Sequence, residues 1–339
     1  MNTAPTATAE PPAREESAAA ALEPCPSDLA WDAFVAGSPQ GSVFCASWFL
    51  RALALDADRF FLRVGGRVLA AALVLRRDGT PVPAPHPFTM YQGILFAPEV
   101  AAWPAHRAGK GIVDLTTALV DALAARYPTL SFCLHPSFTD VRGLQWYRYD
   151  RPDAFRLDVR FTGVLPLAGL RDLDGYLATV RTTRRYEHRR AQSRQLTVEA
   201  SADIDALDRL HRATFERQGL ERAEAEARLL RAITAAALAA DAGELLIART
   251  ASGEPASATL FVRDQHTSYY LFGANAPALR ALNAGTLLVV DSVRRALERG
   301  LTRVDFCGVN SPNRGDFKTS LGGVVTPYFV AHLPEESPR

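Results

Sequence analysis

The sequence predicts a mixed α/β protein made of two similar units in tandem. Residues 111–132 can be laid over residues 285–306 without a gap, and each segment has helically spaced apolar residues followed by a short apolar strand. A strand that begins with glycine lies upstream of each segment, at 66–76 and at 253–263. A self-similar order of this kind indicates a duplicated structural unit.

An aromatic strand follows each glycine-initiated strand, around 91–96 in the first unit and 269–273 in the second. The order strand, strand, strand, helix, strand therefore occurs twice. Chance similarity in a chain rich in alanine and leucine is the alternative. The second unit has further expected elements: a strand at 161–167, helices at 173–194, 204–219 (capped by Asp203) and 221–240, and a strand at 244–250.

The first 27 residues are expected to be a disordered tail. They are rich in Ala, Pro, Glu and Ser and lack the basic start and apolar core of a signal peptide. We expect the first domain over 28–160 and the second over 161–335.

Composition indicates a soluble globular protein. The 339 residues are 48% hydrophobic and 22% charged, and no apolar run is long enough to span a bilayer. A net charge of +1 argues against a protein that coats DNA, so any basic site must be local. Four widely spaced cysteines without a CxxC pair predict reduced thiols, no metal site and a cytoplasmic location. The oligomeric state is left open between monomer and homodimer.

The segment 305–323 has the most informative local sequence. It follows an apolar strand, contains several turn-forming residues with the cations Arg314 and Lys318, and ends before a strand at Val324. This composition predicts a tightly turned loop that presents a cation to an anionic or oxyanionic group. A mobile surface loop with solvated charges is the alternative.

Four short segments resemble the GNAT acyltransferases: Tyr270–Ala274, Ala284–Gly285, Asp305–Gly308 and Phe317–Lys318. As two units in tandem, the chain is similar to the FemABX group of peptidoglycan-bridge aminoacyltransferases and their acetyltransferase-like relatives. The resemblance implies two tandem GNAT-like domains, each a mixed twisted sheet flanked by helices. It also implies that the first domain binds the acceptor and the second is catalytic.

The resemblance assigns a catalytic role to Lys318. Acyl transfer to an amine passes through a tetrahedral oxyanion, which a preorganised cation stabilises. Phe317 would exclude water and position the lysine stem, and Tyr270 could relay a proton through water. Asp305 and Asp316 lie near in sequence, but no general base can be assigned, and Asp305 also fits a role in stabilising the turn.

The donor site is expected at the start of the helix near residue 284. In GNAT enzymes this loop wraps the coenzyme A pyrophosphate, which implies contacts from Arg280, Ala284, Gly285 and Thr286. Here Asn283 stands where the family has glycine, which weakens the coenzyme A assignment. Acyl-CoA and aminoacyl-tRNA both remain open as co-substrates, and no tightly bound cofactor is expected.

A basic segment at 181–194 holds six arginines and one glutamate. At helical spacing Arg184 and Arg185 would share a face that could bind the phosphates of tRNA, a nucleotide sugar or a lipid-linked acceptor. A solvated helix face is the alternative. The other candidate acceptor contacts are Tyr91, His135, Asn310 and Arg314, although a lone histidine before proline is more often a packing residue.

These features together predict an N-acyltransferase that moves an acyl group, expected from acyl-CoA, onto an amine of a cleft-bound acceptor. The segment 310–315 resembles family members associated with cell-envelope glycoconjugates, which implies an amino sugar or a glycoconjugate precursor as acceptor. Two alternatives remain: an aminoacyl-tRNA-dependent aminoacyltransferase, and a non-catalytic binding module that kept the fold.

Overall fold

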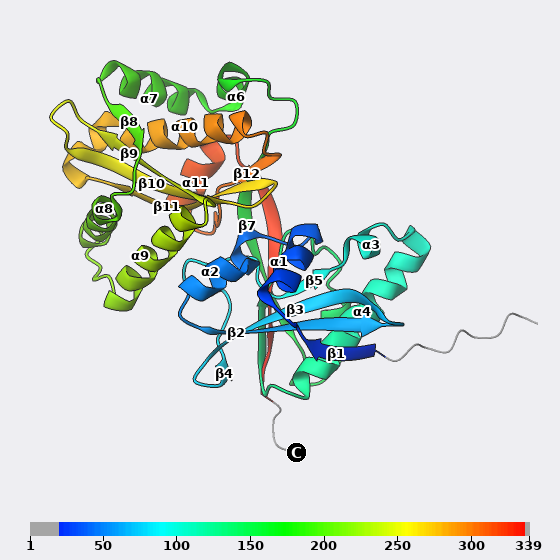
Figure 1. Cartoon of the computed structure of the whole chain (residues 1–339). Helices are drawn as coiled ribbons and strands as arrows, with labels where there is room; N and C mark the ends of the chain where they lie inside the picture. The colour runs from blue at the N-terminus through cyan, green and yellow to red at the C-terminus, as the bar shows by residue number, and fades with distance from the viewer. Residues whose placement is uncertain (1–19, 336–339) are drawn as a thin grey trace, which may run out of the picture.

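The computed structural model describes residues 20–335, which form two lobes joined by a pair of long strands (Figure 1). The first lobe contains a five-stranded sheet in which β5 pairs with β3 beside the path β1-β2-β3-β4. Its strands are β1 (Ala20–Pro24), β2 (Asp56–Val64), β3 (Arg67–Arg77), β4 (Thr80–Pro81) and β5 (Ile94–Phe96). Its helices are α1 (Asp28–Gly37), η1 (Val43–Cys45), α2 (Ser47–Ala52), α3 (Pro98–Ala101), α4 (Ala105–Ala124) and α5 (Arg142–Gln145).

The second lobe is built on an eight-stranded sheet with the order β6-β13-β7-β12-β11-β10-β9-β8. Figure 1 shows α6, α7 and α10 on one face of this sheet and α8 and α9 on the other. The strands are β6 (Leu130–Cys133), β7 (Arg156–Pro166), β8 (Thr197–Ala200), β9 (Gly243–Arg249), β10 (Pro255–Arg263), β11 (Thr267–Asn275), β12 (Arg303–Asp305) and β13 (Val324–Leu333). The helices are α6 (Leu173–Thr179), α7 (Thr182–Ser193), α8 (Ile204–Glu216), α9 (Glu224–Ala239), η2 (Pro277–Leu282), α10 (Ala284–Glu298) and α11 (Pro312–Ser320).

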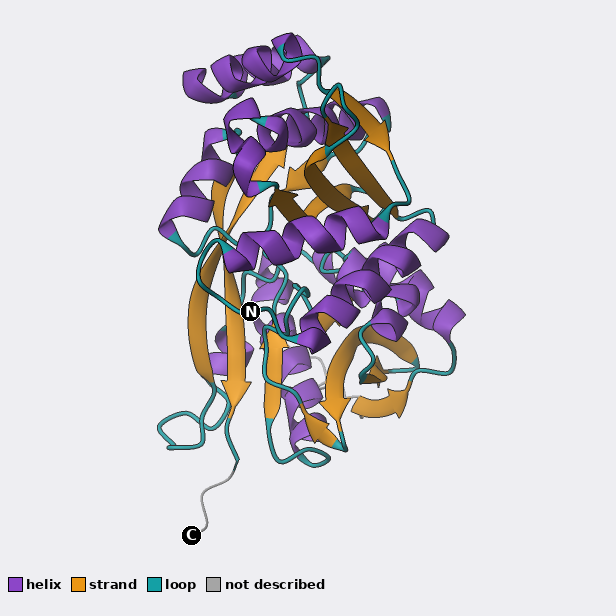
Figure 2. Cartoon of the chain, turned by 90° about the vertical axis from the view of Figure 1, so that its left-hand side faces the viewer, coloured by secondary structure: helices purple, strands orange, loops and turns teal. Residues whose placement is uncertain are grey.

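The two long strands β7 and β13 make the sheet continuous between the lobes. They pair antiparallel from Val324 opposite Val164 to His332 opposite Arg156, and the end of β13 also pairs with β6. Figure 2 shows the strand that leads to the C-terminus running between the two parts of the molecule. The proposed domain boundary between residues 160 and 161 therefore falls inside β7.

The predicted duplication is visible in the elements. The helix α4 leads into β6, and α10 leads into β12, at the positions that the aligned segments 111–132 and 285–306 predict. In α4 the apolar residues Leu115, Leu119 and Leu123 recur every four positions and are buried, so one face of the helix packs into the core. Asp203 caps α8 as predicted, because its carboxylate accepts a hydrogen bond from the backbone N–H of Ala206.

Three sequence expectations are corrected. Residues 20–24 of the expected tail form β1, which pairs with β2, whereas residues 1–19 lie outside the described residues. The helix expected at 173–194 is interrupted at Val180 and Arg181, where the backbone is extended, and becomes α6 and α7. Much of the loop expected at 305–323 is the helix α11, which begins with proline at its first turn after Ser311.

In the described part of the chain no helix is both long and apolar enough to cross a membrane. All four cysteines are free thiols, and Cys45, Cys133 and Cys307 are buried.

Candidate functional site

Two neighbouring parallel strands of the second sheet separate at one end. Their pairing joins Thr267–Tyr269 of β11 to Arg303–Asp305 of β12, but β11 continues to Asn275 while β12 ends. After β12 the backbone turns sharply, with Cys307 at φ 54° in the left-handed region. Side chains from the continuing strand and from α11 therefore meet where the two strands part.

Lys318 of α11 lies at this opening. Its ammonium donates hydrogen bonds to the carbonyl oxygens of Cys307 (2.7 Å) and Gly308 (3.1 Å), and lies 5.6 Å from the ring centroid of Tyr270. An ammonium has three donors, so one N–H remains for a further acceptor. Burial lowers the pKa of Lys318. The structure thus presents a fixed, partly desolvated cation at the open end of the β11–β12 pair.

Asp305 holds the turn that binds Lys318. Its Oδ1 accepts hydrogen bonds from the backbone N–H of Cys307 (2.7 Å) and the hydroxyl of Thr162 (2.5 Å), and its Oδ2 accepts one from the phenol of Tyr91 (2.7 Å). The residue is 3% exposed, and burial raises its pKa. Asp305 is therefore out of reach of a solvent-borne acceptor, and its contacts are those of a turn-stabilising residue.

Tyr91 and His135 are interior residues rather than the acceptor contacts expected from sequence. Tyr91 is 1% exposed, and the ring of His135 packs edge-on against it with centroids 5.1 Å apart. The Nδ1 atom of His135 accepts a hydrogen bond from the backbone N–H of Ser137 (3.1 Å). Burial lowers the pKa of His135 to about 3, so the imidazole is neutral at ordinary pH. The packing role that the sequence also allowed for His135 fits these contacts.

The start of α7 is attached to α11. Arg181 forms an ion pair with Asp316 (2.8 Å), and Nε of Arg184 donates to the hydroxyl of Ser320 (2.9 Å). The guanidinium of Arg184 also lies 5.0 Å from the ring centroid of Phe317, the neighbour of Lys318. Arg184 thus supports the helix of the candidate site instead of presenting itself to solvent. Asp316 is exposed, and its carboxylate is paired with Arg181.

The start of α10 already has an anionic neighbour from within the chain. The carboxylate of Glu187 on α7 accepts hydrogen bonds from the hydroxyl of Thr286 (2.7 Å) and from the guanidinium of Arg184. Helix N-termini favour negative charge, and Glu187 supplies it at the first turn of α10. Sequence reasoning missed this residue, although Glu187 is the one acid among six arginines in its segment.

The predicted donor residues form the connection into α10. Asn283 adopts the left-handed conformation at φ 60° between η2 and α10, a conformation that asparagine tolerates better than most residues. Ala284 and Thr286 are buried, and Arg280 is exposed on η2. A Cβ at Gly285 would lie 2.7 Å from the amide oxygen of Asn275, so a larger residue there would require the Asn275 side chain to shift. The structure brings these residues together at the start of α10.

Three predicted acceptor contacts remain: Asn310, which is hydrogen-bonded to the backbone of β7, and the exposed or partly exposed Arg314 and Arg185. Asn310 accepts from the backbone N–H of Phe161 (2.8 Å) and donates to its carbonyl (2.9 Å), which fixes the segment before α11 to β7. Arg314 is exposed on α11, and its charge contributes to lowering the pKa of Lys318 after the larger effect of burial. Arg185 is partly exposed and donates to the hydroxyl of Thr182 (2.9 Å).

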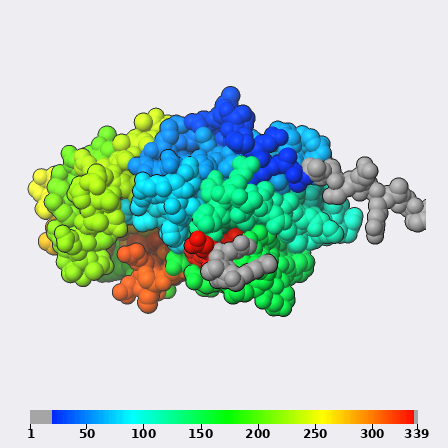
Figure 3. All heavy atoms as spheres, turned by 90° about the horizontal axis from the view of Figure 1, so that it is seen from below, coloured from blue at the N-terminus to red at the C-terminus, as the bar shows by residue number. Residues whose placement is uncertain are grey.

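The surface beside α11 is hollowed. Figure 3 shows a depression between α11 (orange), the region of α8 and α9 (yellow-green) and the light-blue part of the first lobe. The lobes touch here through Phe88, whose ring lies 4.8 Å from that of Phe272 and 6.1 Å from that of His211. Burial lowers the pKa of His211 to about 4. This hollow between the lobes is the candidate acceptor cleft.

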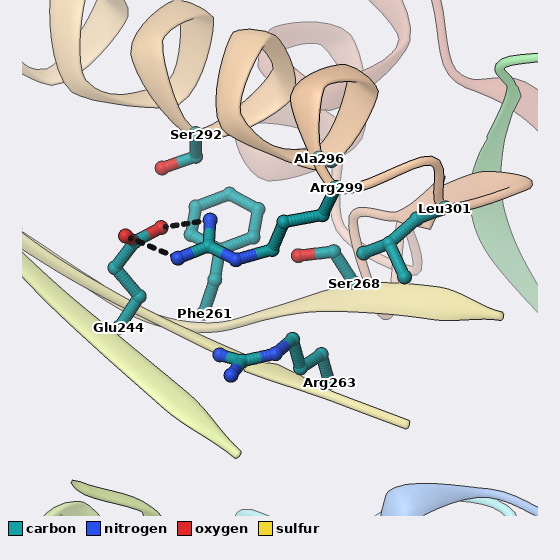
Figure 4. A pocket seen from close by; sticks show the side chains of 8 residues that line it. All are labelled: Glu244, Phe261, Arg263, Ser268, Ser292, Ala296, Arg299 and Leu301. Atoms are coloured by element: carbon teal, nitrogen blue, oxygen red, sulfur yellow. Dashed lines mark hydrogen bonds and ion pairs between the residues drawn. The ribbon is translucent and has the colours of Figure 1, made fainter. Parts of the chain in front are cut away.

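Two other cavities lie away from Lys318. One, between α10 and the strands β9 to β11, has about 10 Å³ of space, which holds one water at most (Figure 4). Glu244 and Arg299 close it with an ion pair of 3.0 Å. The other is an open hollow of about 410 Å³ on the first lobe, lined by Gln145, Trp146, Tyr149, Phe155 and Leu157.

Comparison with known proteins shows what the chain resembles. Residues 178–319 match the acetyltransferase (GNAT) domain family, and no curated protein matches the chain. The crystal structure of FemX has a TM-score of 0.65 and 16% identity, with 91% of this chain and 96% of FemX covered. Residues 178–319 are therefore similar to an acetyltransferase (GNAT) domain, and the chain shares its fold with FemX.

Two further structures extend the likeness to the whole chain. A tandem GNAT protein from the clavulanic acid biosynthesis pathway has a TM-score of 0.53 and 15% identity, covering 95% of this chain and 100% of that one. The C-terminal domain of a putative lysylphosphatidylglycerol synthetase from Agrobacterium fabrum has a TM-score of 0.53 and 12% identity. The match covers 90% of this chain and 91% of that one. The chain has the FemABX-like tandem GNAT fold, as the sequence predicted.

Proposed function

We propose that the chain is an N-acyltransferase in which Lys318 stabilises the oxyanion of the transfer reaction. The observation that carries this proposal is the position of the ammonium. It lies at the open end of the β11–β12 pair of the GNAT domain, held by two carbonyl oxygens and with a third N–H left for an acceptor. Because the cation is already in place, the site does not have to rearrange when negative charge develops on the carbonyl oxygen of the donor.

The reaction follows from this placement. The acceptor amine attacks the carbonyl carbon of the donor, the C–N bond forms, and the carbonyl oxygen becomes an anion next to Lys318. Collapse of this intermediate breaks the bond to the carrier sulfur or oxygen, which leaves as thiol or hydroxyl after taking up a proton. The amine proton passes to water. Tyr270, whose pKa is raised to about 12 by burial, is a neutral phenol at ordinary pH and serves in this scheme as a hydrogen-bonding relay.

The proposed acceptor is the amine of an amino sugar or of another cell-envelope glycoconjugate precursor, bound in the hollow beside α11. Arg314 is exposed on α11 and would pair with a phosphate of a nucleotide- or lipid-linked acceptor. The likeness to FemX and to the putative lysylphosphatidylglycerol synthetase supports a cell-envelope substrate. A cytoplasmic location, where activated carriers are made, is part of this proposal.

Acyl-CoA is the first donor to consider, because the GNAT domain family includes acetyltransferases. Its pyrophosphate would have to bind at Arg280–Thr286, the connection into α10. There the carboxylate of Glu187 already accepts a hydrogen bond from Thr286, and like charges repel at short range. This placement is unfavourable for a pyrophosphate.

Aminoacyl-tRNA is the second donor, and the Glu187–Thr286 contact favours it. A tRNA-linked ester delivers its acyl group without placing a pyrophosphate at the start of α10. The reaction at Lys318 is the same for both donors, with a C–O bond broken in place of a C–S bond.

Incubation of the purified full chain with amine acceptors and each donor class tests the proposal. The donors are a panel of acyl-CoAs and a pool of charged tRNA, the acceptors include free and nucleotide-linked amino sugars, and mass spectrometry detects the new amide. Amide formation with one donor class supports the proposal and identifies the carrier. If no amine is modified with either class, the chain is a binding module and the proposal is wrong.

A further inference from the structure

The helix α7 has two chemically different sides. Arg184, Glu187, His188 and Ala191 face inward, where they are buried or half-buried against α10 and α11. The opposite side of the helix carries Arg185, Tyr186, Arg189 and Arg190, and Arg194 follows at its C-terminal end. This outer face, formed by residues 185, 186, 189 and 190, has no acidic residue, and the exposed Arg194 adds a charge at the end of the helix.

The charges of the outer face are not neutralised within the described protein. Arg189, Arg190 and Arg194 are exposed and form no ion pair between residues 20 and 335. Many other arginines of the chain are paired, as Arg249 is with Glu199 (2.7 Å) and Arg231 is with Asp205 (2.6 Å). Tyr186 stands among the unpaired arginines with 59% of its surface exposed. A cluster of free guanidiniums around an exposed aromatic ring is complementary to a polyanion with stackable groups.

The N-terminal end of α7 lies next to α11, the helix that carries the candidate catalytic residue Lys318. The first turn of α7 is attached to α11 through Arg181–Asp316 (2.8 Å) and Arg184–Ser320 (2.9 Å), and α11 carries Lys318. A helix of 12 residues is about 18 Å long, so a ligand that lies along α7 ends within one helix length of α11.

We propose that the outer face of α7 binds the sugar–phosphate backbone of an RNA that carries the acyl group. From Arg185 to Arg194 the arginines span ten residues, a rise of about 14 Å, which suits successive phosphates better than a single phosphate or pyrophosphate. The exposed tyrosine adds a stacking surface that a simple inorganic anion would not use. This inference rests on the second donor of the proposed function and names the surface that the donor contacts.

Direct binding tests the inference separately from catalysis. Fluorescence anisotropy of labelled, uncharged tRNA measures affinity for the full chain between about 50 and 200 mM salt. The test variant is Arg189→Glu/Arg190→Glu. Its charge-matched control is Arg212→Glu/Arg228→Glu on α8 and α9, which lie on the opposite face of the sheet and whose arginines are 61% and 69% exposed (Figure 1).

The test variant is expected to bind tRNA at least about tenfold more weakly and to lower the slope of log affinity against log salt by about 2, while the control keeps wild-type affinity. The inference is overturned if wild-type protein does not bind tRNA at the lowest salt, or if both variants lose affinity equally. Binding to phosphatidylglycerol vesicles that needs Arg189 and Arg190, without tRNA binding, would overturn it in favour of a lipid surface. Acyl transfer from acyl-CoA without RNA binding would overturn the inference and leave the proposed transferase activity standing.

Discussion

The phenol of Tyr91 donates a hydrogen bond of 2.7 Å to Oδ2 of Asp305, across 214 positions of sequence. The bond joins the first lobe to the turn whose carbonyl oxygens hold Lys318. The first lobe therefore contributes to the shape of the candidate catalytic site as well as to the walls of the cleft.

Replacing Tyr91 by phenylalanine removes this hydrogen bond and keeps the ring. The Oδ2 atom of a buried carboxylate loses its donor, so we expect the free energy of unfolding to fall by about 1–3 kcal/mol. We also expect kcat to fall more than KM changes, because the turn that positions Lys318 loosens. Urea denaturation and steady-state kinetics measure both effects.

Tyr149→Phe is the matched control, since Tyr149 is 69% exposed and follows α5 in the first lobe. If Tyr91→Phe were no less stable and no slower than Tyr149→Phe, the contact between the lobes would have no part in the site.

The pKa of Lys318 can be measured in isolation because the chain contains two lysines, Lys110 and Lys318. Labelling with lysine enriched in ¹⁵N at Nζ gives two signals, and Lys318→Met assigns them. We expect Lys318 to titrate below the ordinary value of 10.5, because burial disfavours its charged form. The rate of acyl transfer should fall as the pH rises through this lowered pKa, since only the ammonium stabilises the oxyanion. A Lys318 signal that titrates at or above 10.5 contradicts the desolvated environment.

Asn310 should act as an anchor and not as an acceptor contact. Asn310→Ala removes both of its hydrogen bonds to the backbone of Phe161, which we expect to cost about 1–3 kcal/mol of stability and to increase hydrogen exchange in residues 306–311. Asn313→Ala, on the exposed first turn of α11, is the control. Unchanged exchange together with a raised KM for the acceptor would show instead that Asn310 binds substrate.

Buried histidines should make the fold sensitive to mild acid. Burial lowers the folded-state pKa of His135 to about 3, whereas an unfolded histidine has a pKa of about 6.5. Below about pH 6.5 the unfolded state takes up a proton that the folded state does not, so stability decreases by up to about 1.4 kcal/mol per pH unit for this residue.

Urea denaturation at several pH values between about 5 and 7.5 measures this slope. His135→Gln should show a shallower dependence of stability on pH than wild type. Equal slopes for wild type and His135→Gln would contradict a buried neutral imidazole.

The elements that the sequence predicted well are those specified by local chemistry. The spacing of Leu115, Leu119 and Leu123 and the capping carboxylate of Asp203 act within one or two helical turns, so their pattern is visible without the fold. The duplicated helix–strand segments could be recognised for the same reason.

The predictions that failed concern segments with conflicting local signals or distant partners. Glycine and asparagine in 310–315 favoured a loop, but Ser311 and Pro312 are also typical of a helix start, and the packing of Phe317 and Lys318 makes the segment helical. The contacts of Tyr91 with Asp305 and of Glu187 with Thr286 join residues far apart in sequence. No spacing within one segment predicts such pairs. The sequence therefore indicates neither the contact of Tyr91 with Asp305 nor that of Glu187 with Thr286.

The most direct test of the central claim is the rate of amide formation by Lys318→Met in a single turnover. Methionine keeps much of the apolar stem and removes the ammonium. The control is Lys110→Met, which removes an exposed lysine paired with Asp114 on α4. We predict that Lys318→Met slows the chemical step by about 100- to 1,000-fold while Lys110→Met matches wild type. A Lys318→Met protein that is folded and transfers the acyl group at the wild-type rate would contradict the assignment of Lys318 to the oxyanion.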